Sequence, residues 1–191
     1  MTTNEKMMKN TLPVALRATA LSVGLATAAL LASPAASAHV TLANPQAMAG
    51  SYVKLVLQVP HGCAGSATRA ITVTLPPELL VAKPMPKAGW RIVTETTPLA
   101  QPAQLHGKPV TETTSLIRWE GGKLPNEFFD EFVVFGKLTD QAQGRLPFKT
   151  LQTCDKGQVD WSGEAGTESP APVLRVEPAA AGAAGAASHP H

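Results

Sequence analysis

The stretch SYVKLVLQVP, residues 51–60, decides the fold class. Its apolar and polar residues alternate and a proline ends it, which is the pattern of a β-strand with one buried face. No stretch of useful length has a helical apolar period. Similar short runs, each bounded by Pro, Gly, Asn or Asp, recur along the chain at RAITVTLP (69–76), GWRIVTET (89–96), TSLIRWEGG (114–122), EFFDEFVVFGKL (127–138), LPFKTLQTC (146–154) and GQVDWSG (157–163). We therefore predict an all-β protein, an immunoglobulin-like or cupredoxin-like β-sandwich of about seven to nine strands.

Two segments depart from this pattern. Residues 97–112 contain three prolines and no periodicity, and we expect a surface loop or an irregular hairpin there. From residue 165 to residue 191 the chain is rich in Ala, Gly and Pro, so we expect a mostly disordered tail, although PVLR (172–175) could add an edge strand. The folded domain is accordingly predicted over residues 39–164.

The first 38 residues have the features of an export signal. A positively charged start is followed by an uncharged apolar run at 18–32 and by Ala36-Ser37-Ala38, the small residues at which a signal peptidase cleaves. The run is about 15 residues, shorter than the roughly 20 of a membrane-spanning helix. We predict cleavage after Ala38 and a periplasmic or secreted protein with no stable membrane anchor; the alternative is an uncleaved anchor.

The charge of the chain after this cleavage is balanced. Three of the 16 Lys and Arg residues and one of the 14 Asp and Glu residues precede residue 39, which leaves 13 basic and 13 acidic residues. A domain without net charge lacks the electrostatic footprint of a protein that binds nucleic acid or an anionic membrane.

The chain has two cysteines, Cys63 and Cys154. In an exported protein such a pair most simply forms a disulfide. A bridge that encloses about 90 residues would stabilise the fold by roughly 4–5 kcal/mol in the chain-entropy model. The alternative is a pair of thiolate ligands for copper.

His39 becomes the first residue of the protein if the signal is cleaved after Ala38. Its α-amine and its imidazole Nδ1 can then bind one metal ion in a six-membered chelate. The amine has a pKa near 8, so copper can displace its proton near neutral pH. Amine and imidazole nitrogens suit Cu(II), which binds more tightly than zinc in the usual affinity order. The alternative is a histidine left there by chance.

Other candidate ligands have ordinary structural explanations. His61 and His106 lie in turn or loop sequences, where a solvated side chain is the usual outcome. His189 and His191 could capture metal weakly or simply be solvated. Methionine thioethers at positions 48 and 85 could assist Cu(I), although filling gaps in a core is the usual role of methionine.

Asp130 and Glu131 lie within the apolar run 127–138. In a strand, the two side chains point to opposite faces and each shares its face with apolar residues. An unpaired charge in such a row is costly, so at least one carboxylate needs a partner. A metal, an arginine such as Arg118 or backbone N–H groups could each serve.

Catalysis has little support in the sequence. The chain lacks the G-x-S-x-G, H-E-x-x-H and Gly-rich phosphate-loop motifs. A copper oxygenase with an N-terminal histidine brace needs a second histidine held by the core, whereas His61 and His106 lie in turn or loop contexts. We therefore predict a protein that is not an enzyme.

Several blocks in order carry a resemblance to a known family. They are AHVTLANPQAMAGSYVKLVLQVPHGC, KAGWRIV, IRWEGGKLPNEFFDEFVVFGKL and LQTCDKGQVDW. Together they resemble the YcnI-like copper-binding domain of exported bacterial proteins over about residues 39–163. The resemblance implies an immunoglobulin-like or cupredoxin-like sandwich that binds Cu(II) at its mature N-terminus, in an arrangement called a monohistidine brace.

The resemblance also implies roles for particular residues. The brace histidine is His39, the tryptophan near the metal matches Trp161, and the carboxylate is carried onto Glu131, although Asp130 could equally serve. Cys63 and Cys154 match the cysteine-bearing branch of the family. Some relatives have a C-terminal membrane helix, whereas this chain ends in an Ala/Gly-rich segment.

These observations lead to one functional expectation and two alternatives. We expect a copper-binding protein of copper trafficking or homeostasis, a metallochaperone whose partner is a copper chaperone or copper transporter of the cell envelope. The alternatives are a copper-dependent redox enzyme of the histidine-brace type and a structural or interaction sandwich without a metal.

Overall fold

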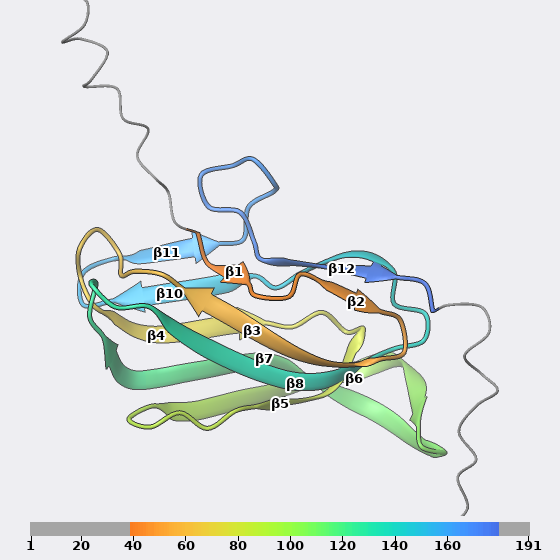
Figure 1. Ribbon diagram of the computed structural model, residues 1–191. Coiled ribbons are helices and arrows are strands. Elements are labelled where there is room, and N and C mark those ends of the chain that lie inside the picture. The colour runs from red at the N-terminus through yellow and green to blue at the C-terminus, as the bar shows by residue number, and fades with distance from the viewer. Residues whose placement is uncertain (1–38, 180–191) are drawn as a thin grey trace, which may run out of the picture. The chain divides into compact units, whose positions relative to one another are not determined.

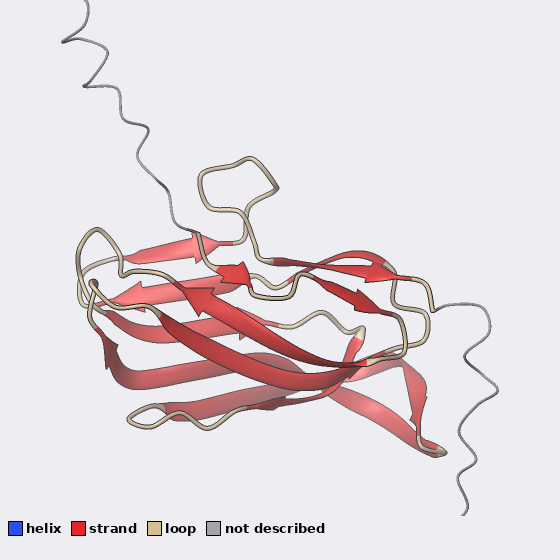
Figure 2. Ribbon diagram, in the orientation of Figure 1, coloured by secondary structure: helices blue, strands red, loops and turns tan. Residues whose placement is uncertain are grey.

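The computed structural model describes residues 39–179. The predicted signal peptide and the last 12 residues, with His189 and His191, lie outside the described part. Within it the structure has strands and no helix, and therefore no helix that could cross a membrane (Figure 2). The strands are β1 (Thr41–Leu42), β2 (Gln46–Met48), β3 (Tyr52–Val59), β4 (Thr68–Thr74), β5 (Leu79–Pro84), β6 (Arg91–Leu105), β7 (Lys108–Leu124), β8 (Asp130–Leu138), β9 (Gly144–Pro147), β10 (Thr150–Cys154), β11 (Gln158–Trp161) and β12 (Val173–Glu177).

The strands form three sheets (Figure 1). One has the order β1-β3-β8-β5, a second β11-β10-β4-β7-β6, and a small third sheet β2-β12-β9. Apolar side chains from the first two sheets share one core, which contains Leu57 of β3, Phe132 of β8, Ile71 of β4 and Trp119 of β7. The predicted all-β class is confirmed, with twelve strands in the described residues because short strands such as β1 and β2 were not separate in the sequence pattern.

The stretch SYVKLVLQVP (51–60) forms β3, and one face of this strand is buried, as its alternation predicts. β3 pairs antiparallel with β8, with Leu57 opposite Phe132 and Val56 opposite Val133. Leu57 and Phe132 point into the shared core, while Gln58 and Glu131 form the next pair on the outer face. The pairing therefore fixes which side chains of β8 are available to solvent.

Residues 97–112 form a hairpin rather than a loop. β6 and β7 pair up to Leu105 and Lys108, leaving His106 and Gly107 as a two-residue turn. Both turn residues have positive φ, 50° and 73°, which is the requirement of a type I′ turn. The irregularity is a register shift between Pro98 and Ala103, so the second of the two predicted alternatives is correct.

The predicted domain end at residue 164 is corrected by β12. Leu174 and Val176 are buried in the core, and β12 is the central strand of its sheet, between β2 and β9. Its contribution was underestimated because only five residues follow the sheet pattern within a segment rich in Ala, Gly and Pro.

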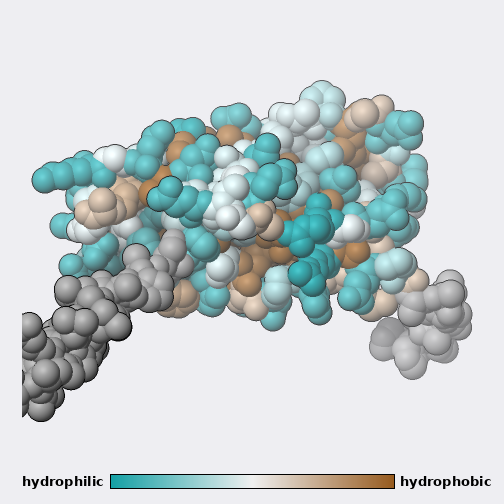
Figure 3. Space-filling model, turned by 90° about the horizontal axis from the view of Figure 1, so that it is seen from above, coloured by the Kyte–Doolittle hydropathy of each residue, from teal (hydrophilic) through white to brown (hydrophobic). Residues whose placement is uncertain are grey.

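Seen from above, hydrophilic side chains cover most of the visible face, with small hydrophobic areas between them (Figure 3).

Candidate functional site

His39 lies two residues before β1, an edge strand of the four-stranded sheet. Its half-buried ring lies against Trp161 of β11, with 5.6 Å between the ring centroids and an interplanar angle of 67°. β11 is the edge strand of the five-stranded sheet, so the two rings meet where the edges of both sheets come together (Figure 1). The structure thus brings together two of the residues singled out in the sequence.

Hydrogen bonds fix the orientation of Trp161. Its indole is buried, with 4% of the residue exposed, and its Nε1–H donates to Oε1 of Gln152 at 3.0 Å. The Gln152 amide nitrogen donates in turn to the carbonyl of His61 at 2.7 Å and to the hydroxyl of Thr68 at 2.8 Å. Since Gln152 uses both ends of its amide, neither it nor the indole can rotate without losing a buried hydrogen bond.

A disulfide joins Cys63 and Cys154, as predicted. It connects the loop after β3 to the end of β10, two residues beyond Gln152. The backbone N–H of Cys63 also donates to the sulfur of Cys154 at 3.0 Å. The bridge therefore holds together the two segments between which Gln152 makes its hydrogen bonds, and the alternative of two free thiolates is excluded.

The two neighbouring carboxylates have different partners. Asp130 accepts a hydrogen bond from Lys87 Nζ at 2.6 Å and another from the backbone N–H of Glu131 at 2.8 Å. Arg118 is not its partner, because that guanidinium lies 3.6 Å from Glu120. The cation for this carboxylate comes from the β5–β6 connection, which the strand pattern alone did not place beside β8.

Glu131 lies on the outer face of β8, and Gln58 of β3 separates it from Thr41 of β1. The amide nitrogen of Gln58 donates to Glu131 Oε1 at 3.2 Å, and its amide oxygen accepts a hydrogen bond from Thr41 at 3.5 Å. Neighbouring strands are about 4.8 Å apart, which places the Cα of Glu131 about 10 Å from that of Thr41. Glu131 is thus linked to β1 through Gln58 and is not packed directly against it.

The apolar rows expected around the carboxylates are shorter than predicted. β8 begins at Asp130, so Phe128 and Phe129 lie in the preceding loop and are 61% and 55% exposed. A turn after Pro125, in which the N–H of Phe128 bonds to the carbonyl of Pro125, keeps both residues out of the strand.

The other predicted ligands are dispersed. The Nδ1 atom of His61 contacts the carbonyl oxygen of Gly62, and His106 at the β6–β7 turn lies 2.7 Å from the hydroxyl of Tyr52. Met48 and Met85 are both exposed. Within residues 39–179, no three His, Cys, Asp or Glu side chains are placed to hold one metal ion.

The structure adds Gln58 and Gln152, which the sequence argument did not select. Gln152 had a detectable signal, because it alternates with Thr150 and Cys154 in a strand whose even-numbered residues are buried. A glutamine at such a position requires hydrogen-bonding partners in the core. Gln58 carries no comparable signal, since it occupies an ordinary outward position of an alternating strand.

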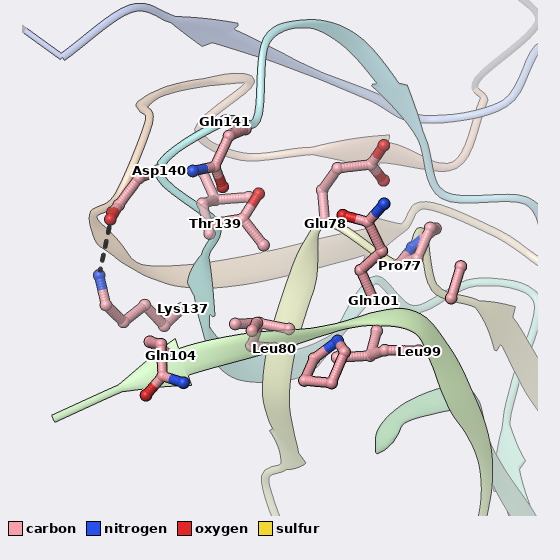
Figure 4. Close-up of a pocket in the computed structure, with 14 residues that line it drawn as sticks. Pro77, Glu78, Leu80, Leu99, Gln101, Gln104, Lys137, Thr139, Asp140 and Gln141 are labelled. Atoms are coloured by element: carbon pink, nitrogen blue, oxygen red, sulfur yellow. Dashed lines mark ion pairs between the residues drawn. The ribbon is translucent and has the colours of Figure 1, made fainter. Parts of the chain in front are cut away.

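A separate cleft of about 730 Å³ lies near the opposite end of β8 (Figure 4). Its lining includes Leu80, residues 99–104 of β6 and residues 137–141. The Lys137–Asp140 ion pair, 3.9 Å long, lies at its border. Of the candidate metal ligands that the structure describes, none lines this cleft.

A protein-family model matches residues 39–176 of the chain. Its description is "Domain of unknown function (DUF1775)". The chain belongs to this family. DUF1775 is the family of YcnI-like domains, so the resemblance drawn from the sequence blocks is confirmed. The match starts at His39 and extends into β12, in agreement with the position of the last strand.

One solved structure similar to this DUF1775 chain is covered almost completely by the match. It is an uncharacterized protein from Nocardia farcinica whose crystal structure is described as revealing an immunoglobulin-like fold. The two are 27% identical, with 72% of this chain and 97% of that chain covered and a TM-score of 0.54. The predicted immunoglobulin-like sandwich is therefore confirmed.

A second similar structure is the major pilin SpaA of Corynebacterium diphtheriae. It is 16% identical, with 73% of this chain and 37% of that chain covered, and its TM-score of 0.30 is too low to support an argument about this chain. A search of curated proteins found no match.

Proposed function

We propose that this DUF1775 protein is exported and binds Cu(II) through His39, as a carrier in copper trafficking or homeostasis. The observation that carries the proposal is the position of His39. It stands at the sheet edge next to Trp161, and the family match begins at the same residue. A chain cleaved before His39 would present a free α-amine at this point.

The ligand chemistry follows from a single residue. The amine and Nδ1 of His39 form a chelate that needs no cluster of side chains, and nitrogen ligands of this kind suit Cu(II). Because binding displaces the proton of the amine, affinity should fall as pH decreases. One residue leaves several copper positions open, which suits a protein that passes its cargo to a copper chaperone or transporter.

Trp161 supports the proposal by limiting one side of this position. The indole is held by Gln152 and by the surrounding core, so it cannot swing into the space around the imidazole. Its edge-to-face contact also restricts the orientation of His39. A ligand whose orientation is fixed before the metal arrives loses less conformational entropy on binding.

Glu131 is the carboxylate that we propose to offset part of the copper charge. Asp130 is already paired with Lys87, whereas Glu131 is held by the neutral amide of Gln58, which also contacts Thr41 near the N-terminus of β1. Because Gln58 stands between Glu131 and β1, Glu131 would act on a copper ion at His39 through its electric field, partly screened by solvent.

The disulfide supports an oxidising location, such as the periplasm or the extracellular space. The proposal therefore includes export by the predicted signal peptide. Binding and release of copper require no catalytic turnover, so we propose a carrier and not an enzyme.

The test compares protein that begins at His39 with protein that carries one additional alanine before His39. We expect tight Cu(II) binding and a nitrogen-coordinated electron paramagnetic resonance spectrum only for the first protein. The insertion keeps the imidazole and the fold but moves the free amine to another residue. Equal affinity and equal spectra in both proteins would refute the brace.

Two controls separate His39 from other histidines. His106→Ala removes an imidazole at the β6–β7 turn and should leave the affinity unchanged. Deletion of residues 188–191 removes His189 and His191, and loss of binding in that variant would place copper on the C-terminal segment instead.

A further inference from the structure

β6 differs from every other edge strand of the described domain. Six strands lie at sheet edges, and β6 is one of them (Figure 1). The other five, β1, β2, β5, β9 and β11, have between two and six residues, whereas β6 has 15. A long edge strand presents a row of unpaired backbone N–H and C=O groups that can pair with another chain.

The two halves of β6 are protected to different extents. The second half contains Pro98, Pro102 and the register shift between Pro98 and Ala103, and each of these features disfavours pairing with another strand. The first half, residues 91–97, has no Pro, Gly or Lys. It pairs with β7 without a register shift from Arg91 to Glu95, and within residues 39–179 no strand pairs with its other edge.

The sequence of this free edge, RIVTE at 91–95, is complementary to itself. When two copies run antiparallel about a two-fold axis at Val93, Arg91 of each copy lies opposite Glu95 of the other. Val93 then meets Val93 at the axis. Opposite charges directly across a strand pair are favourable. A parallel arrangement would instead place Arg91 beside Arg91 and Glu95 beside Glu95 of the second copy, which is unfavourable.

The charged side chains are accessible for this pairing. Arg91 contacts Glu120 of its own chain, yet 72% of its side chain is exposed, which leaves donors for a second carboxylate. Glu95 is also exposed. Five donor groups on one guanidinium can serve two carboxylates at once.

We propose that residues 91–95 of β6 pair antiparallel with the same residues of a second copy and form a two-fold dimer. The pairing joins two five-stranded sheets into one continuous sheet. β11 lies at the far edge of the five-stranded sheet from β6, so both His39–Trp161 pairs remain at the outer edges of the dimer. This inference is independent of copper binding.

The test is a charge exchange followed by sedimentation velocity over a range of protein concentrations. The unmodified protein should show a concentration-dependent dimer. Arg91→Glu and Glu95→Arg should each weaken it about tenfold or more, since each creates two like-charge pairs, and the double variant should recover to within about threefold. Glu168→Arg, in an exposed loop, is the matched control and should have no effect.

A second variant and a second measurement keep the result interpretable. Val93→Lys places two ammonium groups at the axis and should also give a monomer. Hydrogen exchange of the amides in residues 91–97 should slow as the concentration rises. A protein that stays monomeric up to about 1 mM, or a dimer that neither single charge variant weakens, would overturn the proposal.

Discussion

The two edge strands of the five-stranded sheet, β11 and β6, differ in length and in burial. At the β11 edge the strand is short, and the side chains of Trp161 and Gln152 are buried and hydrogen-bonded next to a disulfide. At the β6 edge the strand is long, and residues 94–98 are all exposed. The β11 edge is held by buried hydrogen bonds and a disulfide, whereas the β6 edge exposes backbone groups that can pair with another strand.

This difference teaches where the domain is rigid and where it can accept a partner. Both the nitrogen and the oxygen of the Gln152 amide are hydrogen-bonded within the domain. A substitution at Gln152 therefore leaves buried polar groups without partners and should destabilise the fold. β6 pairs only with β7 among the described strands, and its residues 94–98 are exposed, so changes at these positions should alter association more than folding. The following stability predictions test the contrast.

The largest effect is expected on removing the disulfide. Cys63→Ala combined with Cys154→Ala should lower the free energy of unfolding by about 4 kcal/mol, because the bridge closes a loop with a sequence separation of 91 residues. Urea unfolding followed by circular dichroism measures the change. A loss below about 1 kcal/mol would mean that the β11 edge does not depend on the covalent link.

An intermediate effect is expected for Gln152→Ala. The substitution leaves the Trp161 indole N–H, the Thr68 hydroxyl and the His61 carbonyl without their partner, at a cost of about 2–3 kcal/mol. Chemical unfolding measures the cost. Gln158→Ala, an exposed glutamine on the adjacent strand, is the matched control, and equal losses in both variants would contradict the role assigned to the network.

The smallest effect is expected on β6. Thr96→Ala removes an exposed side chain from the free edge strand and should change the free energy of unfolding by no more than about 0.5 kcal/mol. Thermal unfolding at low protein concentration avoids any contribution from association. A destabilisation as large as that of Gln152→Ala would show that both edges are equally tied to the core.

Strands with strict alternation were predictable from the sequence. β3 and β8 carry apolar residues at every second position, and these positions form the core. The β6–β7 hairpin was left undecided because His106-Gly107 is a less common pair for a type I′ turn than Asn-Gly. β12 was obscured by its surroundings, since five residues contain too few positions to outweigh the composition around them.

The candidate site was predictable only in part, for a geometric reason. The contact of His39 with Trp161 connects residues 122 positions apart, and the resemblance to YcnI-like domains indicated that both belong to one site. The same resemblance did not show that Gln58 stands between β1 and Glu131. Side chains that bridge two strands depend on register, and register is set by the whole sheet.

β12 has a consequence for the synthesis of the protein. It pairs in parallel with β2, with Arg175 opposite Gln46, and in the same sheet it pairs antiparallel with β9. A nascent chain therefore lacks the middle strand of this sheet until residue 177 has left the ribosome. Contacts so distant in sequence form late, so the sheet β2-β12-β9 is the last of the three sheets that can be completed during synthesis.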